Sequence, residues 1–509
     1  MAPTQRVTKA HPDSTANVVV ARWRRVGSIC AGFLLGHCCE LAARTFVCAG
    51  PSAAEMVAQA STGAAKAVQA DSVETRGVIA IFAHFKGELP GEGEPPSWAH
   101  GLFDVERPGS FSHFYDAMSF GALRISGEVA VRRYQVEGEA AAYLADEPGT
   151  PGAFGRFVLD VLRQADEDID FSRYDNDGPD GLADSGDDDG VADAVFIVTA
   201  SAPRGFLIDA ATGISDLGLD EDFVTNDTGF AGQPVLVAAT QGTVQQGRWF
   251  EEAAGVTCHE FGHLLGLRDL FNTRYFQQQD APPAEDSAGI GAWGLMGWGA
   301  LGWNGDDGPN SFSAWSRMKL GWHNLREVRR SQKRLSLTDV AQSGAMLKIP
   351  LTSREYFLLE HRRSSSYYDR NIPGDGLLIW HVERTAPEAD LASGVYNPVR
   401  DVVDLESADG RWREGGYPAG QTPDNRSGGD NLDFWAHDVG YTDEHAGNLG
   451  DGSDLFDGVR FREFGPETNP SSYSNDGVRS IRVSVRLFKL RACGHVDISK
   501  IDATLCDHS

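Results

Sequence analysis

Long apolar runs and basic charge are what this sequence lacks. No stretch of about 18 uninterrupted apolar residues occurs, which excludes a multi-spanning membrane protein. Lys and Arg number 45 against 73 Asp and Glu, which gives a formal net charge of −28. Because nucleic-acid binding needs clustered basic side chains, we expect no nucleic-acid partner. We also expect no stable transmembrane span in the mature chain, and we favour a monomer.

Cysteines are few, and their positions divide them into groups. Seven occur, and four of these, including Cys48, fall within the first 50 residues. If those four leave with a targeting segment, the mature chain keeps Cys258 and the pair Cys493 and Cys506. The short spacer in that pair is compatible with a disulfide and with an oxidising compartment, but it leaves open whether the bond forms.

The N-terminus has the layout of an export signal. Three arginines precede the short apolar stretch 26–36, and small residues follow it. We predict a leader at residues 1–50, a linker or short propeptide at 51–75, and a secreted or cell-envelope protein. A disordered tail with a chance apolar patch is the alternative.

The rest of the chain changes character near residue 330. Buried strands are predicted at 77–84 and 194–199 with a helix at 155–166 between them, an order typical of an α/β core. Beyond residue 330, short strands are predicted at 334–337, 345–349, 356–361, 376–382 and 480–487. We therefore expect an α/β (α+β) domain at 76–330, a β-rich C-terminal subdomain at 331–490 and a tail at 491–509.

One segment carries a metal-ligand pattern, CHEFGHLLGLRD at residues 258–269. On a helix, positions i and i+4 lie above one another, so His259 and His263 can present ring nitrogens to one Zn²⁺. Glu260, beside the first histidine, falls close enough to take a proton from a water at the metal. A helix with two surface histidines is the alternative, and the full spacing of the motif argues against it.

The residues after the second histidine complete the pattern. Gly266 can adopt a left-handed conformation, so that the chain turns and Asp269 returns as a third ligand. Two imidazoles and one carboxylate leave a fourth position for water, as in a catalytic zinc site. Met296, in a Gly-rich loop, is either an apolar floor under the zinc or a core-filling side chain. We expect Cys258 to be a buried thiol, because it points away from the histidine face.

The extended motif resembles that of metzincin-type metallopeptidases, and its wider context resembles the immune inhibitor A family of secreted bacterial zinc peptidases. The similarity covers residues 77–487 and is carried by SFSHFYDAMSFGAL, FSAWSRMKLGW, YFLLEHR and PGDGLLIWHVE. It implies a zincin-like catalytic domain at 76–330, with a zinc-ligand helix and a Met-turn. It also implies His259, His263 and Asp269 as zinc ligands, Glu260 as general base and Met296 as the Met-turn residue.

Two positions depart from the family pattern. Arg268 stands where the family often has Pro, which leaves the chain leading to Asp269 less rigid. Trp298 stands where many metzincins have Tyr, and an indole cannot supply a phenolic hydrogen bond to an oxyanion. The oxyanion partner therefore stays open.

Acidic loops are candidates for calcium binding. Alternating Asp residues with Gly at tight turns can gather about six to eight oxygens around Ca²⁺. The candidates are Asp175, Asp177, Asp180, Asp184, Asp187, Asp189 and Asp193, with Asp451 and Asp454 as a weaker patch. No Glu occupies the twelfth position of an EF-hand, and a solvated acidic loop is the alternative. The family resemblance implies calcium near the first loop and favours Asp175, Asp177 and Asp180.

These features predict a secreted zinc metalloendopeptidase that acts on proteins or peptides, with Ca²⁺ as a structural cofactor. Three other classes are open. A catalytically silent zinc- and calcium-binding adhesive module would not need Glu260. A zinc hydrolase of non-peptide amides or esters would have a narrow pocket. An acidic calcium-binding structural protein would leave the histidine pair unexplained.

Overall fold

The structure is a computed structural model of the 509-residue chain. It describes residue 48 and residues 73–90, 93–176, 178, 180–271, 290–384, 388–390, 395–397, 401–408, 450–468, 470–487 and 493–502. The predicted leader and linker lie outside these residues, except for Cys48 and 73–75. Asp177 and Cys506 also lie outside them.

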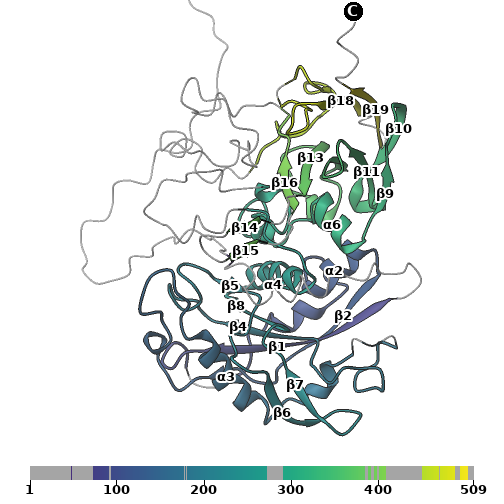
Figure 1. Cartoon of the computed structure of the whole chain (residues 1–509). Coiled ribbons are helices and arrows are strands. Elements are labelled where there is room, and N and C mark those ends of the chain that lie inside the picture. Colours follow the sequence, from purple (N-terminus) through teal and green to yellow (C-terminus); the bar gives the residue numbers. More distant parts are fainter. Residues whose placement is uncertain are drawn as a thin grey trace, which may run out of the picture. The chain divides into compact units, whose positions relative to one another are not determined.

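A mixed sheet organises the first region (Figure 1). Its strands have the order β2-β1-β4-β8-β5, with β3 beside β1. They are β1 (Glu74–His84), β2 (Leu123–Val129), β3 (Tyr134–Gln135), β4 (Ala194–Thr199), β5 (Gly213–Ile214) and β8 (Gly242–Gln246). Neighbours are parallel except β5, which pairs antiparallel with β8 at one edge. The strands predicted at 77–84 and 194–199 are thereby confirmed as β1 and β4.

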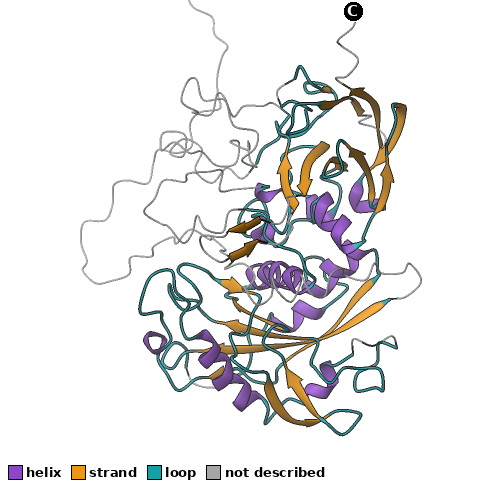
Figure 2. Cartoon of the chain, viewed as in Figure 1, coloured by secondary structure: helices purple, strands orange, loops and turns teal. Residues whose placement is uncertain are grey.

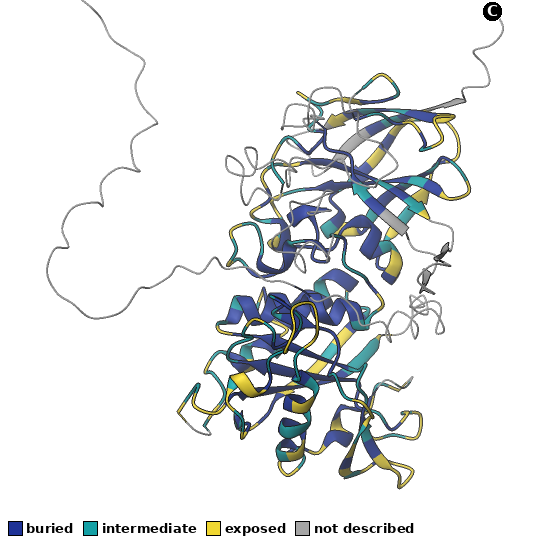
Figure 3. Ribbon diagram, turned by 60° about the vertical axis from the view of Figure 1, so that its left-hand side comes forward, coloured by how far each residue is buried: buried dark blue, intermediate teal, exposed yellow. Residues whose placement is uncertain are grey.

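Both faces of this sheet are buried (Figure 3). Alternate residues of a strand point to opposite faces, so neighbouring residues join different apolar clusters. Ile79 of β1 belongs to one apolar cluster together with helix α3 (Phe154–Ala165). Val78 belongs to another cluster, with helices α2 (Phe111–Ser119) and α4 (Phe250–Leu264). The sheet therefore has helices on both faces, and the predicted α/β core and its helix α3 are confirmed.

The second region consists mainly of two sheets (Figure 2). Their orders are β16-β13-β12-β11-β9 and β10-β19-β18-β17. The strands are β9 (Asn324–Glu327), β10 (Gln332–Thr338), β11 (Ala345–Pro350), β12 (Glu355–Arg362), β13 (Gly376–Arg384), β16 (Asp401–Leu405), β17 (Glu463–Phe464), β18 (Arg479–Leu487) and β19 (Cys493–Asp502). Side chains of both sheets, among them Ile349 and Val483, form a third apolar cluster.

The strand predictions beyond residue 330 are confirmed as β10, β11, β12, β13 and β18. One prediction needs correction. Residues 493–502, assigned from the sequence to a C-terminal tail, form β19, because Val496 and Ile498 are buried in the third apolar cluster. The β-rich region also begins with β9, slightly before residue 331.

Short elements complete the described chain. They are β6 (Phe223–Thr228), β7 (Pro234–Val237), β14 (Glu388–Asp390), β15 (Val395–Asn397), α6 (Ala314–Leu320), α7 (Val340–Ser343), η1 (Ala99–Phe103), η2 (Ala140–Ala142), η3 (Phe171–Tyr174), η4 (Gly291–Trp293), η5 (Gly299–Leu301) and η6 (Tyr367–Asp369). Among the helices of the described ranges, none is long and apolar enough to cross a membrane.

Candidate metal centre

Helix α4 carries the motif and ends as the sequence predicts. Gly266 has a φ of +84°. Its N–H donates to the His263 carbonyl at 2.8 Å, and the Leu267 N–H donates to the Gly262 carbonyl at 3.0 Å. This pair of bonds is a Schellman ending, which turns the chain back along the helix. The left-handed conformation predicted for Gly266 is therefore confirmed.

The turn brings Asp269 back to the two histidines. Asp269 Oδ1 lies 3.0 Å from His259 Nε2 and 3.6 Å from His263 Nε2. Both imidazoles are fully buried. Burial disfavours a charged His263, but Asp269 outweighs this effect and raises the pKa of that imidazole to about 9. Burial likewise opposes the charge on Asp269, and His263 and His259 nonetheless hold its pKa well below the usual range.

A backbone carbonyl orients each imidazole. His259 Nδ1 lies 2.8 Å from the Leu295 carbonyl oxygen, and His263 Nδ1 lies 2.9 Å from that of Leu267. A carbonyl only accepts hydrogen bonds, so each Nδ1 carries the proton. Nε2 is then the nitrogen through which each ring can bind a cation, with loss of any proton held there.

Glu260 lies on the same turn of α4 and is fully buried. Burial raises the pKa of its carboxyl group. Its Oε1 has no hydrogen-bond partner among the residues that the structure describes. Since a buried acceptor without a partner is destabilising, this oxygen is suited to a group that the chain itself does not provide.

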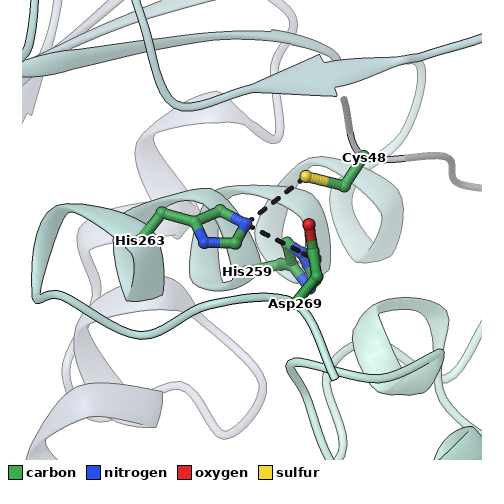
Figure 4. A group of neighbouring side chains, drawn as sticks. All are labelled: Cys48, His259, His263 and Asp269. Carbon is green, nitrogen blue, oxygen red and sulfur yellow. Dashed lines mark hydrogen bonds and ion pairs between the residues drawn. The ribbon is translucent and has the colours of Figure 1, made fainter. Parts of the chain in front are cut away.

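Cys48 is a fourth member of the cluster, and sequence reasoning missed it by grouping it with the leader. Its sulfur lies 3.4 Å from His263 Nε2 (Figure 4). It also lies 3.7 Å from Glu260 Oε2. No spacing rule could have found it, because 212 residues separate Cys48 from Glu260. Cys258, by contrast, is buried but lies outside the cluster, as expected.

The donor atoms fit zinc. Nitrogen, oxygen and sulfur ligands of a tetrahedral zinc ion lie about 2.0 to 2.3 Å from it, and are therefore roughly 3.3 to 3.6 Å apart. Two of the separations between donor atoms, 3.4 and 3.6 Å, fall within this range, and the third, 3.0 Å, is slightly shorter. Donor atoms of Cys48, His259, His263 and Asp269 all lie within 4.8 Å of one another.

Met296 packs beneath the ligand helix. It is fully buried, and its carbonyl oxygen accepts a hydrogen bond from the Leu270 N–H at 2.8 Å. A Cβ added at Gly262 would lie 2.7 Å from the Met296 sulfur. This contact places Met296 against the ligand helix at the residue before His263, and its role as a floor under the zinc stays a prediction.

The two departures from the family pattern have specific neighbours. The Arg268 guanidinium lies over the Trp315 ring at 5.7 Å, a contact that holds the segment before Asp269. The Trp298 ring centroid lies 5.5 Å from that of Phe271, which in turn lies 6.4 Å from that of His259. Trp298 is therefore linked to the centre through Phe271.

The acidic candidates between β1 and β4 have different environments. Asp193 is tied to β1, because its carboxylate accepts the Gly77 N–H at 2.6 Å and lies 3.6 Å from Arg76. Asp175 is buried and accepts the Gly190 N–H at 2.9 Å. The exposed candidates are Asp180, Asp184, Asp187 and Asp189.

Two oxygens in this loop stand out. Asp188 Oδ1 and Asn176 Oδ1 are buried and have no hydrogen-bond partner within the described part of the chain. Neither residue was among the predicted ligands. Burial raises the pKa of the Asp188 carboxyl group.

The weaker pair of candidates lies in the β-rich region. Asp454 is fully buried and accepts hydrogen bonds from Trp293 Nε1 at 2.7 Å and from the Ser407 hydroxyl at 3.0 Å. Its Oδ2 also accepts the Asp451 N–H at 2.8 Å. Asp451 Oδ1 itself accepts hydrogen bonds from the backbone N–H and the hydroxyl of Ser453. Asp454 thus ties the β-rich region to the loop that leads to Met296.

Comparison with known proteins agrees with this geometry. Residues 97–326 match the model of the family described as immune inhibitor A peptidase M6, catalytic domain. Over 239 residues the chain is 30% identical to the pre-pro-metalloprotease PrtV of Vibrio cholerae serotype O1, in strain M66-2 and in strain ATCC 39315 / El Tor Inaba N16961. This match covers 42% of the chain and 23% of each relative, so the chain spans less than a quarter of their length. Residues 97–326 are therefore similar to the catalytic domain of immune inhibitor A peptidases, the family that the sequence resembles.

Proposed function

We propose that this protein is a secreted zinc metalloendopeptidase with a zincin-like catalytic domain. One observation carries the proposal: the donor atoms of His259, His263 and Asp269 converge beside the buried carboxylate of Glu260. The family match supports a metal-dependent peptidase, and the relative's description as a pre-pro-metalloprotease supports export. Proteins or peptides are the proposed substrates.

The chain would hold zinc through the Nε2 atoms of both histidines and through the Asp269 carboxylate. Bound zinc supplies a Lewis acid at the scissile carbonyl and lowers the pKa of water. The Leu295 and Leu267 carbonyls fix the imidazole tautomers. Glu260 accepts a proton from the attacking water and returns it to the leaving amine.

We further propose that the acidic loop at 175–193 binds Ca²⁺ in a structural role. The buried oxygens of Asp188 and Asn176, which have no hydrogen-bond partner among the described residues, support this, since each is an oxygen donor that a cation could bind. Asp175, which precedes Asn176 in the chain, is also buried. Asp193 is engaged with β1, so we favour the other residues of the loop as ligands.

The test of the peptidase is a comparison of two substitutions on α4. Glu260→Gln should abolish casein cleavage while zinc, measured by elemental analysis, stays bound. Glu251→Gln in the first turn of the same helix, outside the cluster, should retain both properties. Full activity of Glu260→Gln would overturn the assignment of the general base. A wild-type chain that binds no zinc would overturn the metal site.

A further inference from the structure

The sulfur of Cys48 stands where a metal ligand would stand. It faces His263 Nε2 at 3.4 Å, and it belongs to the same group of donor atoms as His259 and Asp269 (Figure 4). Cys48 is only 2% exposed. A thiol among three other zinc donors, with all four within 4.8 Å of one another, brings the number of donors to the four that tetrahedral zinc takes.

The backbone at Cys48 is held independently of its side chain. Cys48 forms a parallel β-bridge with Gly213, in the edge strand β5. Extended peptides commonly bind proteins by adding to an exposed sheet edge. Cys48 therefore lies at a sheet edge that an extended substrate could otherwise use.

The same sulfur also lies in front of the proposed base. It is 3.7 Å from Glu260 Oε2, within the space that a water deprotonated by Glu260 would need. A thiolate is a strong zinc ligand and loses its proton on binding. A ligand tethered to the same chain also has a high effective concentration, so an outside water competes poorly with it.

We propose that Cys48 is the fourth ligand of the zinc ion and holds the peptidase in a latent form until the thiol is removed from the site. This inference rests on the proposed zinc site, and it requires a leader that ends before Cys48 rather than at residue 50. Activation then requires blocking of the thiol or cleavage of the chain after Cys48. Cys258 offers a matched control, because it is a second buried thiol next to His259 in the chain but outside the donor group.

The first test reads metal coordination without using activity. Full-length protein, verified by intact mass to retain Cys48, is loaded with Co²⁺ in place of zinc. The wild-type chain and Cys258→Ala should both show a near-ultraviolet thiolate-to-cobalt charge-transfer band, and Cys48→Ala should lack it. Absence of the band from the wild-type protein, or its persistence in Cys48→Ala, would overturn the proposal.

The second test measures casein cleavage by the same zinc-loaded proteins. Cys48→Ala should be at least about tenfold faster than wild type, the change expected when a closed state populated to roughly 90% is lost. Cys258→Ala should match wild type. If the wild-type chain is active and Cys48→Ala cleaves casein at the same rate, the latency proposal is overturned. If the band depends on Cys48 but no variant cleaves casein, the ligand assignment stands and the endopeptidase proposal fails.

Discussion

The sulfur of Met296 lies against the backbone of Gly262, so closely that a Cβ at residue 262 would stand 2.7 Å from it. Gly262 precedes His263 on α4, and the Met296 loop supplies the Leu295 carbonyl that orients His259. The absence of one side chain therefore sets how closely the loop approaches the helix and where both imidazoles lie. Small shifts of metal ligands are costly for binding and catalysis.

Gly262→Ala should therefore weaken zinc binding. The added methyl group must displace the Met296 sulfur or the helix, and we expect zinc affinity to fall by at least about tenfold. Overpacking should also destabilise the fold by about 1 to 3 kcal/mol. Competition of the full-length protein with a chromophoric zinc chelator measures the affinity.

Two further variants test whether the contact between residue 262 and Met296 causes the loss of zinc affinity. Gly186→Ala should have no effect, because its new Cβ would meet only the ring of exposed Phe230, at 3.3 Å. Adding Met296→Ala to Gly262→Ala should recover part of the zinc affinity by vacating the space. A double variant no better than Gly262→Ala alone would show that this contact is not the cause.

The features that could be predicted well from the sequence are those determined by residues close together in the chain. Strands β1 and β4 follow from continuous apolar runs, and the end of α4 follows from Gly266, since periodicity and capping act over a few positions. The histidine pair follows from the geometry of one helix turn. All of these signals can be read within a short window of the chain.

The features that the sequence missed depend on contacts between distant residues. Cys48 reaches Glu260 across 212 residues, and Asp454 accepts the Trp293 indole across 161. Neither contact leaves a local pattern, because both arise from packing after the chain has folded. An acidic residue in a Gly-rich loop also has the same local pattern whether it binds calcium or accepts an indole N–H.

Calcium should stabilise the protein through the loop at 175–193. At a concentration 100 times its dissociation constant, an ion that binds only the folded state adds about 2.7 kcal/mol of stability. We expect thermal unfolding of the zinc-loaded protein to shift upward by at least roughly 2 °C when Ca²⁺ is added. Differential scanning fluorimetry over a calcium titration measures the shift.

Asp188→Asn should remove most of this calcium-dependent shift, because its buried Oδ1 is the proposed ligand. Asp220→Asn, which changes an exposed carboxylate outside the loop, should keep it. Equal calcium-dependent shifts in both variants would exclude Asp188 as a ligand. If Ca²⁺ causes no shift in the wild-type protein, the loop is a solvated acidic loop that does not bind calcium.

Asp454 should matter for stability through its hydrogen bonds. Asp454→Ala leaves the buried indole of Trp293 and the Ser407 hydroxyl without their acceptor, which should cost about 2 to 4 kcal/mol. Asp451→Ala, which removes only a local cap on Ser453, should cost less than about 1 kcal/mol. Urea unfolding in a Glu260→Gln background, which prevents self-digestion, measures both. If the Asp454→Ala loss appears only when Ca²⁺ is present, the residue is instead a calcium ligand.

Asp339 should make stability depend on pH. It is fully buried, its Oδ1 accepts the Ala341 N–H at 3.1 Å, and its Oδ2 has no hydrogen-bond partner in the described ranges. Burial raises the pKa of this carboxyl group to about 6. Because the folded state then holds the proton more tightly than the unfolded state, the stabilisation is complete below the unfolded pKa and is lost as pH rises through about 6.

Asp339→Asn cannot titrate, so the difference in unfolding free energy between wild type and this variant isolates the effect. We expect wild type to lose stability relative to Asp339→Asn by at most about 3 kcal/mol between about pH 4 and pH 7. His361, whose pKa burial lowers to about 4, titrates nearby but is present in both chains and cancels. Urea unfolding across this range, again in the Glu260→Gln background, gives the difference at each pH. If the difference in unfolding free energy does not change with pH, Asp339 has the same pKa in the folded and unfolded states. Water would then reach its carboxylate.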